Sequence, residues 1–481
     1  MSVIYAHLLG FIGLVAAVLH VIGIVVAGHA VMNVRTSQAA VAWAIALITF
    51  PYITLPLYAV FGRDRFHGYM EALADENIPI RRIAQEVANA HSPEIVVPFE
   101  GSEASMEALQ LLAKMPFTRH NEVRLLVNGR ATFDAIFDAI ERAKEYILLQ
   151  FFIVNDDRLG GEMQKRLIRK AAEGVKVYFL FDEVGSHSLS SSYVNELNAA
   201  GVSMKPFRTT RGRANRFQVN FRNHRKIVVV DGLEAYVGGH NIGDEYLGGD
   251  PKLSPWRDTH VKVSGPSVLG IQLSFLEDWY WASRSVPDLN WVPSIAEEGG
   301  KRVLVFGSGP ADDMGTCSLF FVQAINMARD RVWITSPYFV PDEAVLSALR
   351  LAAMRGVDVR IMMPEKIDHL MAYLAAFSFL DETACECLEI YRYQDGFLHQ
   401  KVLLVDDELA AVGTANLDSR SLRLNFEIIL VIADTDFASE VAAMLEEDFS
   451  HCRKADIAEY EQRSLWFRIA VRVARLFSPI L

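Results

Sequence analysis

The sequence predicts an α/β protein built from two duplicated halves, each a mixed sheet flanked by helices, related by a pseudo-twofold axis and preceded by two transmembrane helices. Three observations predict this fold. Two long apolar runs lie near the N-terminus. Behind them, short apolar runs alternate with amphipathic stretches, which is typical of α/β layers. The order of these elements then repeats, which indicates a duplicated domain rather than a solenoid.

Composition excludes some classes of protein. The 481 residues are 51% apolar, so the chain can bury a large core. A net charge of -12 argues against a nucleic-acid-binding protein, because affinity for phosphate backbones comes mostly from clustered Lys and Arg. Four cysteines are too few for a disulfide framework and lack zinc-ligand spacing; they are Cys317, Cys385, Cys387 and Cys452. We expect no metal site, and ordinary helix packing for Cys385 and Cys387.

The first apolar run, Leu8 to Ala27, has no ionisable group except His20. At 1.5 Å per residue, about twenty residues cross a ~30 Å hydrocarbon core. A second run extends from Ala39 to Phe61. A cleaved signal peptide is the competing interpretation, but the basic n-region is missing and a second apolar run follows at once. Residues 1–65 are therefore expected to form a two-helix transmembrane anchor.

Basic residues predict the orientation of this anchor. The connection between the two runs carries Arg35 as its one full charge, and no Asp or Glu precedes Asp64. More basic residues follow the second run, namely Arg63, Arg65, Arg81 and Arg82. The positive-inside rule then predicts a helical hairpin with both ends inside and the large domain in the cytoplasm.

The repeated elements predict two halves. In the first half we expect a strand at Tyr146 to Val154, a helix at Gly161 to Glu173 that stops at Gly174, and a strand at Val175 to Phe181. The second half repeats this order with a strand at Val332 to Val340, a helix at Asp342 to Arg355, a stop at Gly356 and a strand at Val357 to Met363. The expected segments are the anchor, a connecting region at 66–118, halves at 119–295 and 296–460, and a basic amphipathic C-terminal helix at 461–481.

One His-x-Lys-x4-Asp motif occurs in each half. The motifs are His224-Arg-Lys226-Ile-Val-Val-Val-Asp231 and His399-Gln-Lys401-Val-Leu-Leu-Val-Asp406. A single His beside an apolar strand is more often structural, but two copies would arise by chance in roughly 2 chains in 10,000. At the same offset each copy leads into a glycine turn and an asparagine, Asn241 and Asn416. His240, His260 and His451 lack such support and are expected to be structural.

Two His and two Lys that converge across a twofold axis suit phosphodiester exchange without a metal. One imidazole can attack phosphorus and the other can protonate the departing alkoxide. The ammonium groups, with the Asn amides, can bind the non-bridging oxygens. Each His also needs a partner that fixes its tautomer, and the candidates are Asp258 and Glu427.

These residues resemble the phospholipase D superfamily, and bacterial cardiolipin synthases most closely. The resemblance is carried by Phe221-Arg-Asn-His-Arg-Lys226, Gly238-Gly-His-Asn-Ile-Gly-Asp-Glu-Tyr-Leu247, Trp256-Arg-Asp-Thr-His260, Ser336-Pro-Tyr-Phe-Val-Pro-Asp342 and Gly413-Thr-Ala-Asn-Leu-Asp418. It covers nearly the whole chain and implies a protein of the bacterial inner membrane.

The resemblance implies a role for each site residue. His224 would form a phosphatidyl-histidine intermediate, and His399 would act first as general acid and then as base. Asp258 would orient His224, and Glu427 would orient His399. The phosphate would be held by Lys226, Lys401, Asn241 and Asn416. Asp231 and Asp406 belong to the motif, but their distance from each Lys favours a role in bracing the fold.

The implied reaction transfers a phosphatidyl group from one phosphatidylglycerol to another, giving cardiolipin and glycerol with no cofactor. Phosphatidylethanolamine as donor stays open, and so does a homo-oligomer. The alternatives are a hydrolytic phospholipase D, a nuclease-like phosphodiesterase and a catalytically silent membrane scaffold. The two motifs alone do not separate transfer from hydrolysis, which depends on whether water or a lipid alcohol reaches the intermediate.

Two basic features are expected to face lipid. Between Glu196 and Asp231 there is no acidic residue but eight basic ones, namely Lys205, Arg208, Arg211, Arg213, Arg216, Arg222, Arg225 and Lys226. We interpret them as a head-group funnel, with a solvated loop as the alternative. The C-terminus separates Arg468, Arg472 and Arg475 from Trp466, Ile469, Val473 and Phe477 on helical faces. This pattern predicts an interfacial helix, or a terminal helix docked on the catalytic core.

Overall fold

The computed structural model describes residues 2–34, 36–63, 65–74, 79–90, 92–98, 104–211, 215, 218–297, 299–382, 388–456 and 462–481. They belong to two compact units. The smaller is Met1–Glu71 with Thr209–Phe221, and the larger is Ala72–Arg208 with Arg222–Leu481. Six residues of the sequence predictions lie outside the described ranges: Arg35, Asp64, Arg213, Arg216, Cys385 and Cys387.

The smaller unit begins with the expected apolar helix, α1 (Ser2–Asn33). Its segment His7–Asn33 is the one helix among the described residues that is long and apolar enough to cross a membrane. At 1.5 Å per residue, its 27 residues extend about 40 Å. The first predicted span is therefore confirmed in length and composition.

The second predicted span is wrong as a single helix. The run Ala39 to Phe61 forms two short helices, α2 (Ser37–Thr49) and α3 (Pro51–Phe61), which are separated at Phe50. Phe50 has φ -132° and ψ 57°, because a proline lacks the N–H of a continuing helix and disfavours the helical conformation of the residue before it. The 13 residues of α2 extend only about 20 Å, which is less than the hydrocarbon core.

The two short helices pack against α1. Ala27, Ala30, Leu47 and Tyr58 form a small shared core. A side chain at Gly23 would begin 2.3 Å from the carbonyl oxygen of Leu47, so only glycine allows this close approach. Helices α1, α2 and α3 thus form one packed bundle.

The larger unit is built around one mixed sheet whose two halves have the same strand order. In the first half the order is β1 (Thr118–Val127), β9 (Thr259–Ser264), β7 (Glu234–Gly238), β6 (Ile227–Val230), β2 (Tyr146–Phe151), β3 (Lys176–Asp182) and β4 (Ser203–Phe207). In the second half it is β10 (Lys301–Ser308), β19 (Asn425–Ala433), β17 (Leu409–Gly413), β16 (Val402–Val405), β11 (Arg331–Thr335), β13 (Asp358–Pro364) and β14 (Leu388–Tyr393), with β20 (Cys452–Lys454) at the edge. The halves join where β1 pairs antiparallel with β10. The predicted duplication is confirmed.

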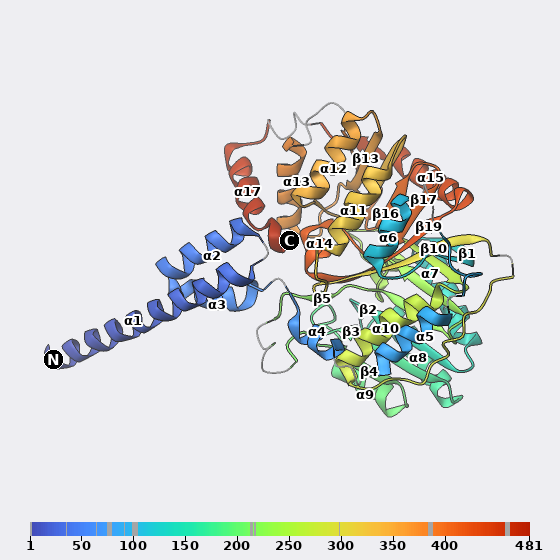
Figure 1. Ribbon diagram of the computed structural model, residues 1–481, viewed down its shortest axis with the longest axis horizontal. Coiled ribbons are helices and arrows are strands. Elements are labelled where there is room, and N and C mark those ends of the chain that lie inside the picture. The colour runs from blue at the N-terminus through green and yellow to red at the C-terminus, as the bar shows by residue number, and fades with distance from the viewer. Residues whose placement is uncertain are drawn as a thin grey trace. The chain divides into compact units, whose positions relative to one another are not determined.

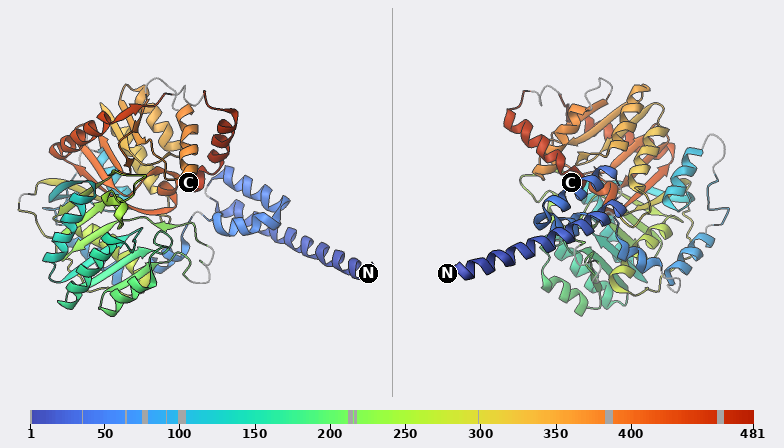
Figure 2. Two further views of the ribbon diagram at one scale, coloured as in Figure 1. Left: turned by 180° about the vertical axis from the view of Figure 1, so that it is seen from behind. Right: turned by 60° about the vertical axis from the view of Figure 1, so that its left-hand side comes forward.

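Helices lie on both sides of this sheet, and the second half lies beside the first (Figures 1 and 2). The helices of the first half and its approach are α4 (His67–Ala74), α5 (Pro79–Ala90), α6 (Ala104–Ala113), α7 (Asn128–Arg142), α8 (Arg158–Ala172), α9 (Ser191–Ala199), the 3-10 helix η3 (Asp244–Leu247) and α10 (Val268–Ser283). Those of the second half are α11 (Thr316–Met327), α12 (Glu343–Met354), α13 (Leu370–Glu382), α14 (Ser419–Arg423), α15 (Thr435–Ser450), α17 (Leu465–Leu476) and the 3-10 helix η4 (Ser478–Ile480).

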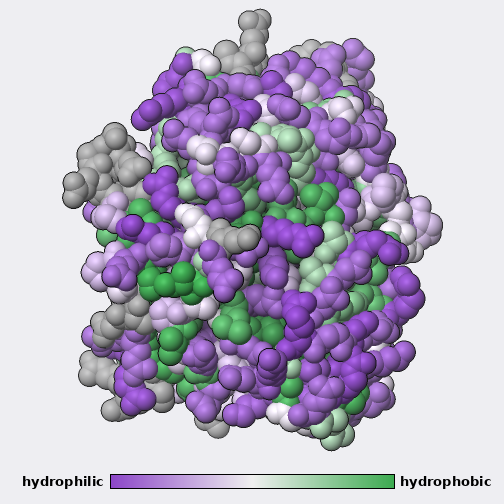
Figure 3. Space-filling model, turned by 90° about the vertical axis from the view of Figure 1, so that its right-hand side faces the viewer, coloured by the Kyte–Doolittle hydropathy of each residue, from purple (hydrophilic) through white to green (hydrophobic). Residues whose placement is uncertain are grey.

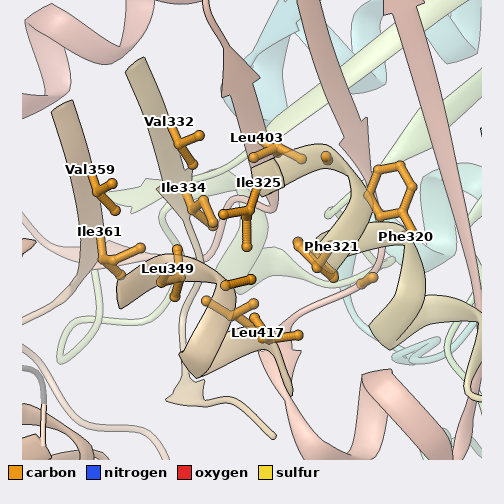
Figure 4. Close-up of a cluster of buried hydrophobic side chains, with 14 of the residues drawn as sticks. Phe320, Phe321, Ile325, Val332, Ile334, Leu349, Val359, Ile361, Leu403 and Leu417 are labelled. Atoms are coloured by element: carbon orange, nitrogen blue, oxygen red, sulfur yellow. The ribbon is translucent and has the colours of Figure 1, made fainter. Parts of the chain in front are cut away.

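Each half has its own hydrophobic core. In the second half, side chains of α11 and α12 pack onto those of β11, β13 and β16 (Figure 4). Phe320, Ile325, Leu349 and Ile361 are fully buried there. The equivalent cluster of the first half lies under α7 and α8. At roughly 25 cal/mol per Å² of apolar surface buried, such clusters supply most of the stabilisation of a domain.

The predicted stops of both helices are confirmed, as is the start at Asp342, but the first helix begins at Arg158, three residues before the predicted Gly161. The side chain of Asp157 accepts the backbone N–H of Gly160 at the start of α8, and Asp342 accepts that of Val345 at the start of α12. Both helices end before glycines with positive φ, 93° at Gly174 and 88° at Gly356.

The two predicted strands before these helices are too long. Regular pairing of β2 ends at Phe151, and pairing of β11 ends at Thr335. Pro337 follows β11, and a proline cannot donate to a ladder. The chain resumes pairing as a single bridge at Val154 in the first half and as β12 (Phe339–Val340) in the second. Both breaks lie at the end of the sheet where the motif residues are found.

Candidate active site

Short strands hold each motif histidine against the opposite half. His224 follows β5 (Arg222–Asn223), which pairs parallel with β19. His399 follows β15 (Phe397–Leu398), which pairs parallel with β8 (Trp256–Arg257). The backbone N–H of His224 donates to the carbonyl of Phe426 at 2.9 Å, and that of His399 donates to the carbonyl of Arg257 at 2.8 Å. Each histidine is therefore positioned by the backbone of the other half.

Because β5 and β15 each pair with a strand of the opposite half, each motif histidine faces a carboxylate from that opposite half. This arrangement corrects the sequence prediction. Nδ1 of His224 lies 3.0 Å from Oε2 of Glu427, and Nδ1 of His399 lies 2.7 Å from Oδ2 of Asp258. The prediction had assigned Asp258 to His224 and Glu427 to His399. It was wrong because β5 and β15 cross between the halves, so each carboxylate orients the histidine of the opposite motif.

Glu427 is fully buried and its oxygens are saturated with hydrogen bonds. Oε2 accepts the hydroxyl of Thr414 at 2.6 Å in addition to facing His224. Oε1 accepts the hydroxyl of Ser421 at 2.8 Å and the amide of Asn425 at 3.2 Å. Burial alone would raise the pKa of Glu427, but His224 and Lys226 hold it below its usual range. The sequence prediction missed Thr414 and Ser421, although Thr414 lies within a motif that it quoted.

Asp258 has two buried histidines close to it. Its Oδ1 accepts the backbone N–H of Thr259 at 2.8 Å, and the pKa of the carboxyl lies well below its usual range although burial opposes this. Positive charge on His240, His399 and Lys401 would favour the carboxylate form of Asp258.

His240 and His260 are two further buried histidines. Nδ1 of His240 lies 3.1 Å from Nδ1 of His260, and burial lowers the pKa of His240 to about 4. His240 and His260 are thus neutral core residues, in agreement with the prediction that they are structural.

Burial keeps both motif histidines neutral in the free site. It lowers the pKa of His224 to about 4 and that of His399 to about 3, against the opposing effect of their carboxylate partners. With Nδ1–H directed at a carboxylate, Nε2 of each ring carries the free lone pair. A neutral imidazole with a free Nε2 is the form that can attack phosphorus.

The two motif lysines are buried beside these rings. Nζ of Lys226 donates to the carbonyl of His224 at 2.7 Å, and Nζ of Lys401 lies 3.0 Å from Nδ1 of His399. Burial lowers the pKa of Lys226 to about 7 and that of Lys401 to about 8. Each ammonium also lowers the pKa of the other half's histidine, so the four side chains form one electrostatic site. A bound phosphate anion would offset this excess of positive charge.

The two asparagines are held by the fold. Oδ1 of Asn241 accepts the backbone N–H of Ile153 at 3.0 Å, and its amide donates to the hydroxyl of Tyr246 at 2.8 Å. The amide of Asn416 donates to Asp418 at 3.1 Å. Each Asn amide has a second N–H, so the predicted phosphate contacts are compatible with this arrangement.

Aromatic rings surround the histidines. Phe152 lies edge-on to His224 at 5.0 Å between ring centroids. Trp256 lies 5.1 Å from His399, and Tyr246 lies 6.4 Å from it. Trp256 and Tyr246 also line a cavity of about 540 Å³. These rings restrict access of water to the imidazoles.

The aspartates of the motif brace the sheet, as expected. Asp231 accepts the backbone N–H groups of Lys144, Glu145 and Tyr146 at 2.8 to 2.9 Å. Asp406 makes the equivalent bonds to residues 329–331. Both have positive φ, 53° and 51°, in the small left-handed region that Asp tolerates better than most residues. They are structural residues that hold the chain entering β2 and β11.

Replacing Asp231 with alanine is expected to lower the free energy of unfolding by about 3 kcal/mol, because three hydrogen bonds to a carboxylate are lost and alanine is strained at this φ. The melting temperature should fall by several degrees, while turnover per folded molecule stays near the wild-type value. Asp407→Ala is the matched control, because its ion pair with Arg331 is exposed and is worth at most about 1 kcal/mol. Equal melting temperatures for the two variants would contradict this role.

The predicted head-group funnel is wrong for part of its residues. Arg225 and Lys226 are buried, and Arg225 donates to Asp278 at 2.9 Å and to the carbonyl of Glu427 at 3.1 Å. Arg208 pairs with Glu183 at 2.8 Å on the surface. The prediction included these residues because a run of basic residues in the sequence does not show which of them are buried or paired.

The remaining histidine and cysteines named in the sequence analysis lie apart from the motif residues. His451 pairs with Asp395 at 2.7 Å on the surface. Cys317 and Cys452 are free thiols. Within the part of the chain that is described, no group of three His, Cys, Asp or Glu is arranged to hold a metal ion.

Comparisons with known proteins agree with this geometry. A family model described as "Cardiolipin synthase, PLD-like domain" matches residues 136–250 and 321–451. The chain is 51% identical over 477 residues to cardiolipin synthase A of Pseudomonas fluorescens, covering 99% of both chains. It is also 51% identical over 480 residues to cardiolipin synthase A of Pseudomonas putida strain W619, covering 98% of both. The crystal structure of phosphatidylserine synthase from Haemophilus influenzae superposes with a TM-score of 0.61 at 18% identity, over 79% of this chain and 100% of that one, which shows the shared fold.

Proposed function

Because the chain belongs to the cardiolipin synthase family with phospholipase D-like domains, we propose that it transfers a phosphatidyl group from one phosphatidylglycerol to a hydroxyl of another, giving cardiolipin and glycerol. The observation that carries the proposal is the crossed pairing of two buried histidines with two carboxylates. Each half contributes one histidine and orients the other, which suits a displacement in two steps at one phosphorus.

In the first step Nε2 of His224 attacks phosphorus, the bond from phosphorus to the glycerol oxygen breaks, and His399 gives its proton to that oxygen. In the second step His399 takes the proton of the acceptor hydroxyl. The acceptor oxygen then attacks phosphorus, and the bond to Nε2 of His224 breaks. The phosphoester is exchanged without a nucleotide or other cofactor, and Lys226 and Lys401 bind the phosphate charge in both steps.

The general acid must be protonated although burial lowers the pKa of His399. Binding of the phosphodiester anion adds a negative charge to a site with two ammonium groups, which raises the pKa of the imidazoles. His399 therefore gains its proton with the substrate, while Asp258 stabilises the resulting imidazolium.

Hydrolysis by water is the competing outcome of the second step. The aromatic rings around His224 and His399 favour a lipid alcohol as acceptor, because they make the site less accessible to water. The test is incubation of the purified chain with phosphatidylglycerol in detergent, followed by mass spectrometry of the lipids. Cardiolipin and glycerol in equal amounts are expected. Phosphatidic acid without cardiolipin would identify a hydrolase, and product formed only with added phosphatidylethanolamine would identify another donor.

We also propose the domain organisation and location of the chain. The anchor is residues 1–65, the two halves of the catalytic body are 119–295 and 296–460, and the anchor lies in the bacterial cell membrane. With α1 as the spanning helix, α2 and α3 enter the bilayer and return to the same side, because neither is long enough to cross. The first 34 residues contain no Lys or Arg, whereas Arg63 and Arg65 follow α3. The positive-inside rule then favours an N-terminus outside and a catalytic body in the cytoplasm. This proposal replaces the predicted hairpin with both ends inside, because one spanning helix puts its two ends on opposite sides of the membrane.

A cysteine introduced at Ser2 tests this topology. In intact spheroplasts, a membrane-impermeant maleimide is expected to label Ser2→Cys from outside, because α1 crosses the bilayer once before the short helices return. The wild-type chain is the control, since its four cysteines all belong to the catalytic body. Labelling of Ser2→Cys only after lysis would place the N-terminus inside and contradict the proposal.

A further inference from the structure

The C-terminal helix α17 is docked on the second half by one face only. Val471 and Ala474 are buried against the core, and the ring of Phe467 lies edge-on to Phe377 of α13 at 5.2 Å. The helix lies beside α13 in Figures 1 and 2. The sequence analysis left open whether the C-terminal helix docks on the core or lies in a membrane interface, and the docking is confirmed. The docked face contains only some of the apolar residues of α17, however.

The opposite face of α17 is apolar and exposed. Six large apolar side chains recur at helical spacing there, with exposed fractions of 68% for Leu465, 79% for Trp466, 43% for Ile469, 47% for Val473, 76% for Leu476 and 45% for Phe477. By contrast, the face of the molecule in Figure 3 is covered mainly by hydrophilic residues. Contiguous exposed apolar surface on a protein with a well-packed core usually marks an interaction site.

Arginines border one side of this exposed stripe. At 100° per residue, Arg468, Arg472 and Arg475 project between the exposed apolar face and the docked face. The guanidinium of Arg475 lies 5.5 Å above the ring of Phe379 on α13. An apolar stripe bordered by arginines is the pattern of a helix that lies in the interface of an anionic bilayer, with its basic residues at head-group level.

The residues that follow α17 are hydrogen-bonded to α14, which adjoins the active site. The backbone N–H of Arg420 on α14 donates to the carbonyl oxygen of Leu481 at 3.0 Å, and its guanidinium donates to that of Ile480 at 3.0 Å. The neighbouring Ser421 donates to the catalytic carboxylate of Glu427 at 2.8 Å. The chain end thus rests on the short helix that helps to hold the partner of His224.

A second exposed apolar segment begins α13. Ile367, Leu370 and Met371 are 44%, 62% and 37% exposed. Asp368 between them accepts the hydroxyl of Tyr338 and contributes to the electrostatic environment of Lys401. This segment is therefore electrostatically coupled to the active site, and it leads into α13, the helix against which α17 packs.

We propose that the exposed face of α17, together with Ile367, Leu370 and Met371, is a membrane-docking surface that inserts into an anionic bilayer and holds the active site close to the lipid head groups. The proposal rests on the lipid substrate of the proposed function. According to this proposal the larger unit contacts lipid directly through α17, in addition to the membrane anchoring proposed for α1.

The first test compares two presentations of the same substrate. The full-length triple variant Trp466→Ser, Ile469→Ser, Val473→Ser is assayed in proteoliposomes of phosphatidylcholine with a low fraction of phosphatidylglycerol, and in mixed detergent micelles. We expect at least a fivefold loss of cardiolipin formation in bilayers and less than a twofold change in micelles. The matched control, Leu233→Ser, Val292→Ser, Ile295→Ser, removes three apolar side chains of similar exposure from other surfaces and should leave both rates unchanged.

Equal rates of the triple variant and the wild type in bilayers would overturn the docking surface, and so would an equal loss in micelles. If the wild type forms no cardiolipin in micelles, the proposed function itself fails, so the two failures are distinguishable. If the variant keeps its bilayer activity but dissociates an oligomer in light scattering, the face binds a second copy of the chain and the proposal is wrong.

The second test measures insertion directly. In proteoliposomes that contain lipids brominated near the head group, tryptophan fluorescence of the wild type should be quenched more strongly than that of Trp466→Phe. Trp466 would account for the difference, because the other six tryptophans are common to both chains. Identical quenching of the two chains would show that Trp466 does not reach the lipid and would overturn the proposal.

Discussion

His224→Ala and His399→Ala are each expected to lower cardiolipin formation by at least about 10⁴-fold, because removing one member of a catalytic unit costs nearly as much as removing the whole unit. Without His224 no covalent bond to phosphorus forms. Without His399 the general acid of the first step is lost, and the glycerol oxygen leaves as an alkoxide. Rates are measured by mass spectrometry of lipids from purified variants whose melting temperatures match the wild type.

A substrate with a better leaving group separates the two roles. A phosphatidyl ester of p-nitrophenol needs no general acid, so His399→Ala should release one equivalent of p-nitrophenol per enzyme and then stop with His224 phosphatidylated. His224→Ala should release none. The reverse pattern would exchange the roles of nucleophile and acid, and undiminished cardiolipin formation by either variant would contradict the mechanism.

The motif residues were predictable from the sequence because each set is contiguous and occurs twice. His224 and Lys226, with His399 and Lys401, lie together in the structure and influence each other's pKa. The bracing role of Asp231 was also predictable, since a residue five positions beyond the lysine lies at the far end of β6 from the site. These inferences need only the local spacing of residues along a strand.

The partners of the histidines were not predictable in the same way. They depend on two-residue strands, and the pairing of β5 with β19 joins residues about two hundred positions apart. No local pattern encodes such a pairing. The two-helix anchor failed for a different reason: the prediction counted Ala39 to Phe61 as one span by its apolar length, although Pro51 breaks the helix at Phe50.

A buried network fixes the crossed arrangement. Nε and Nη2 of Arg257 donate to the two carboxylate oxygens of Asp448 on α15, at 2.6 Å each, and Gln400 donates to the same carboxylate at 2.8 Å. These bonds join the residue before Asp258 to the residue after His399 and to the second half. Truncating one partner of such a buried pair commonly costs 3–5 kcal/mol, so the halves do not shift freely against each other. The site depends on both halves keeping one register.

Glu427→Gln and Asp258→Asn are expected to lower turnover by roughly 10²- to 10⁴-fold while the fold is retained, because an amide no longer fixes the Nδ1–H tautomer or stabilises the imidazolium. The crossed pairing predicts different affected steps. With the p-nitrophenyl substrate, Glu427→Gln should slow the burst, since it orients the nucleophile His224. Asp258→Asn should leave the burst nearly unchanged and slow only reactions that need His399. A slowed burst in Asp258→Asn with an unchanged burst in Glu427→Gln would instead support the uncrossed pairing. Asp395→Asn, which weakens one of the two surface pairs of His451, is the matched control and should have no effect.

The pH dependence of kcat/KM gives an independent readout of the same carboxylates. Burial lowers the pKa of Lys226 to about 7, and the charge of Glu427 is the largest influence that raises it. The ammonium form binds phosphate, so kcat/KM of the wild type should fall as the pH rises through this pKa in the free enzyme. Removing the charge of Glu427 lowers the pKa of Lys226 further, and the alkaline limb should move to lower pH in Glu427→Gln.

Asp258→Asn should shift the limb in the same direction through Lys401, because the charge of Asp258 is the largest influence that raises the pKa of Lys401. If turnover falls but the alkaline limb of the kcat/KM profile does not move, these carboxylates only orient the imidazole rings. If the alkaline limb moves to higher pH, the electrostatic coupling of the two halves is contradicted.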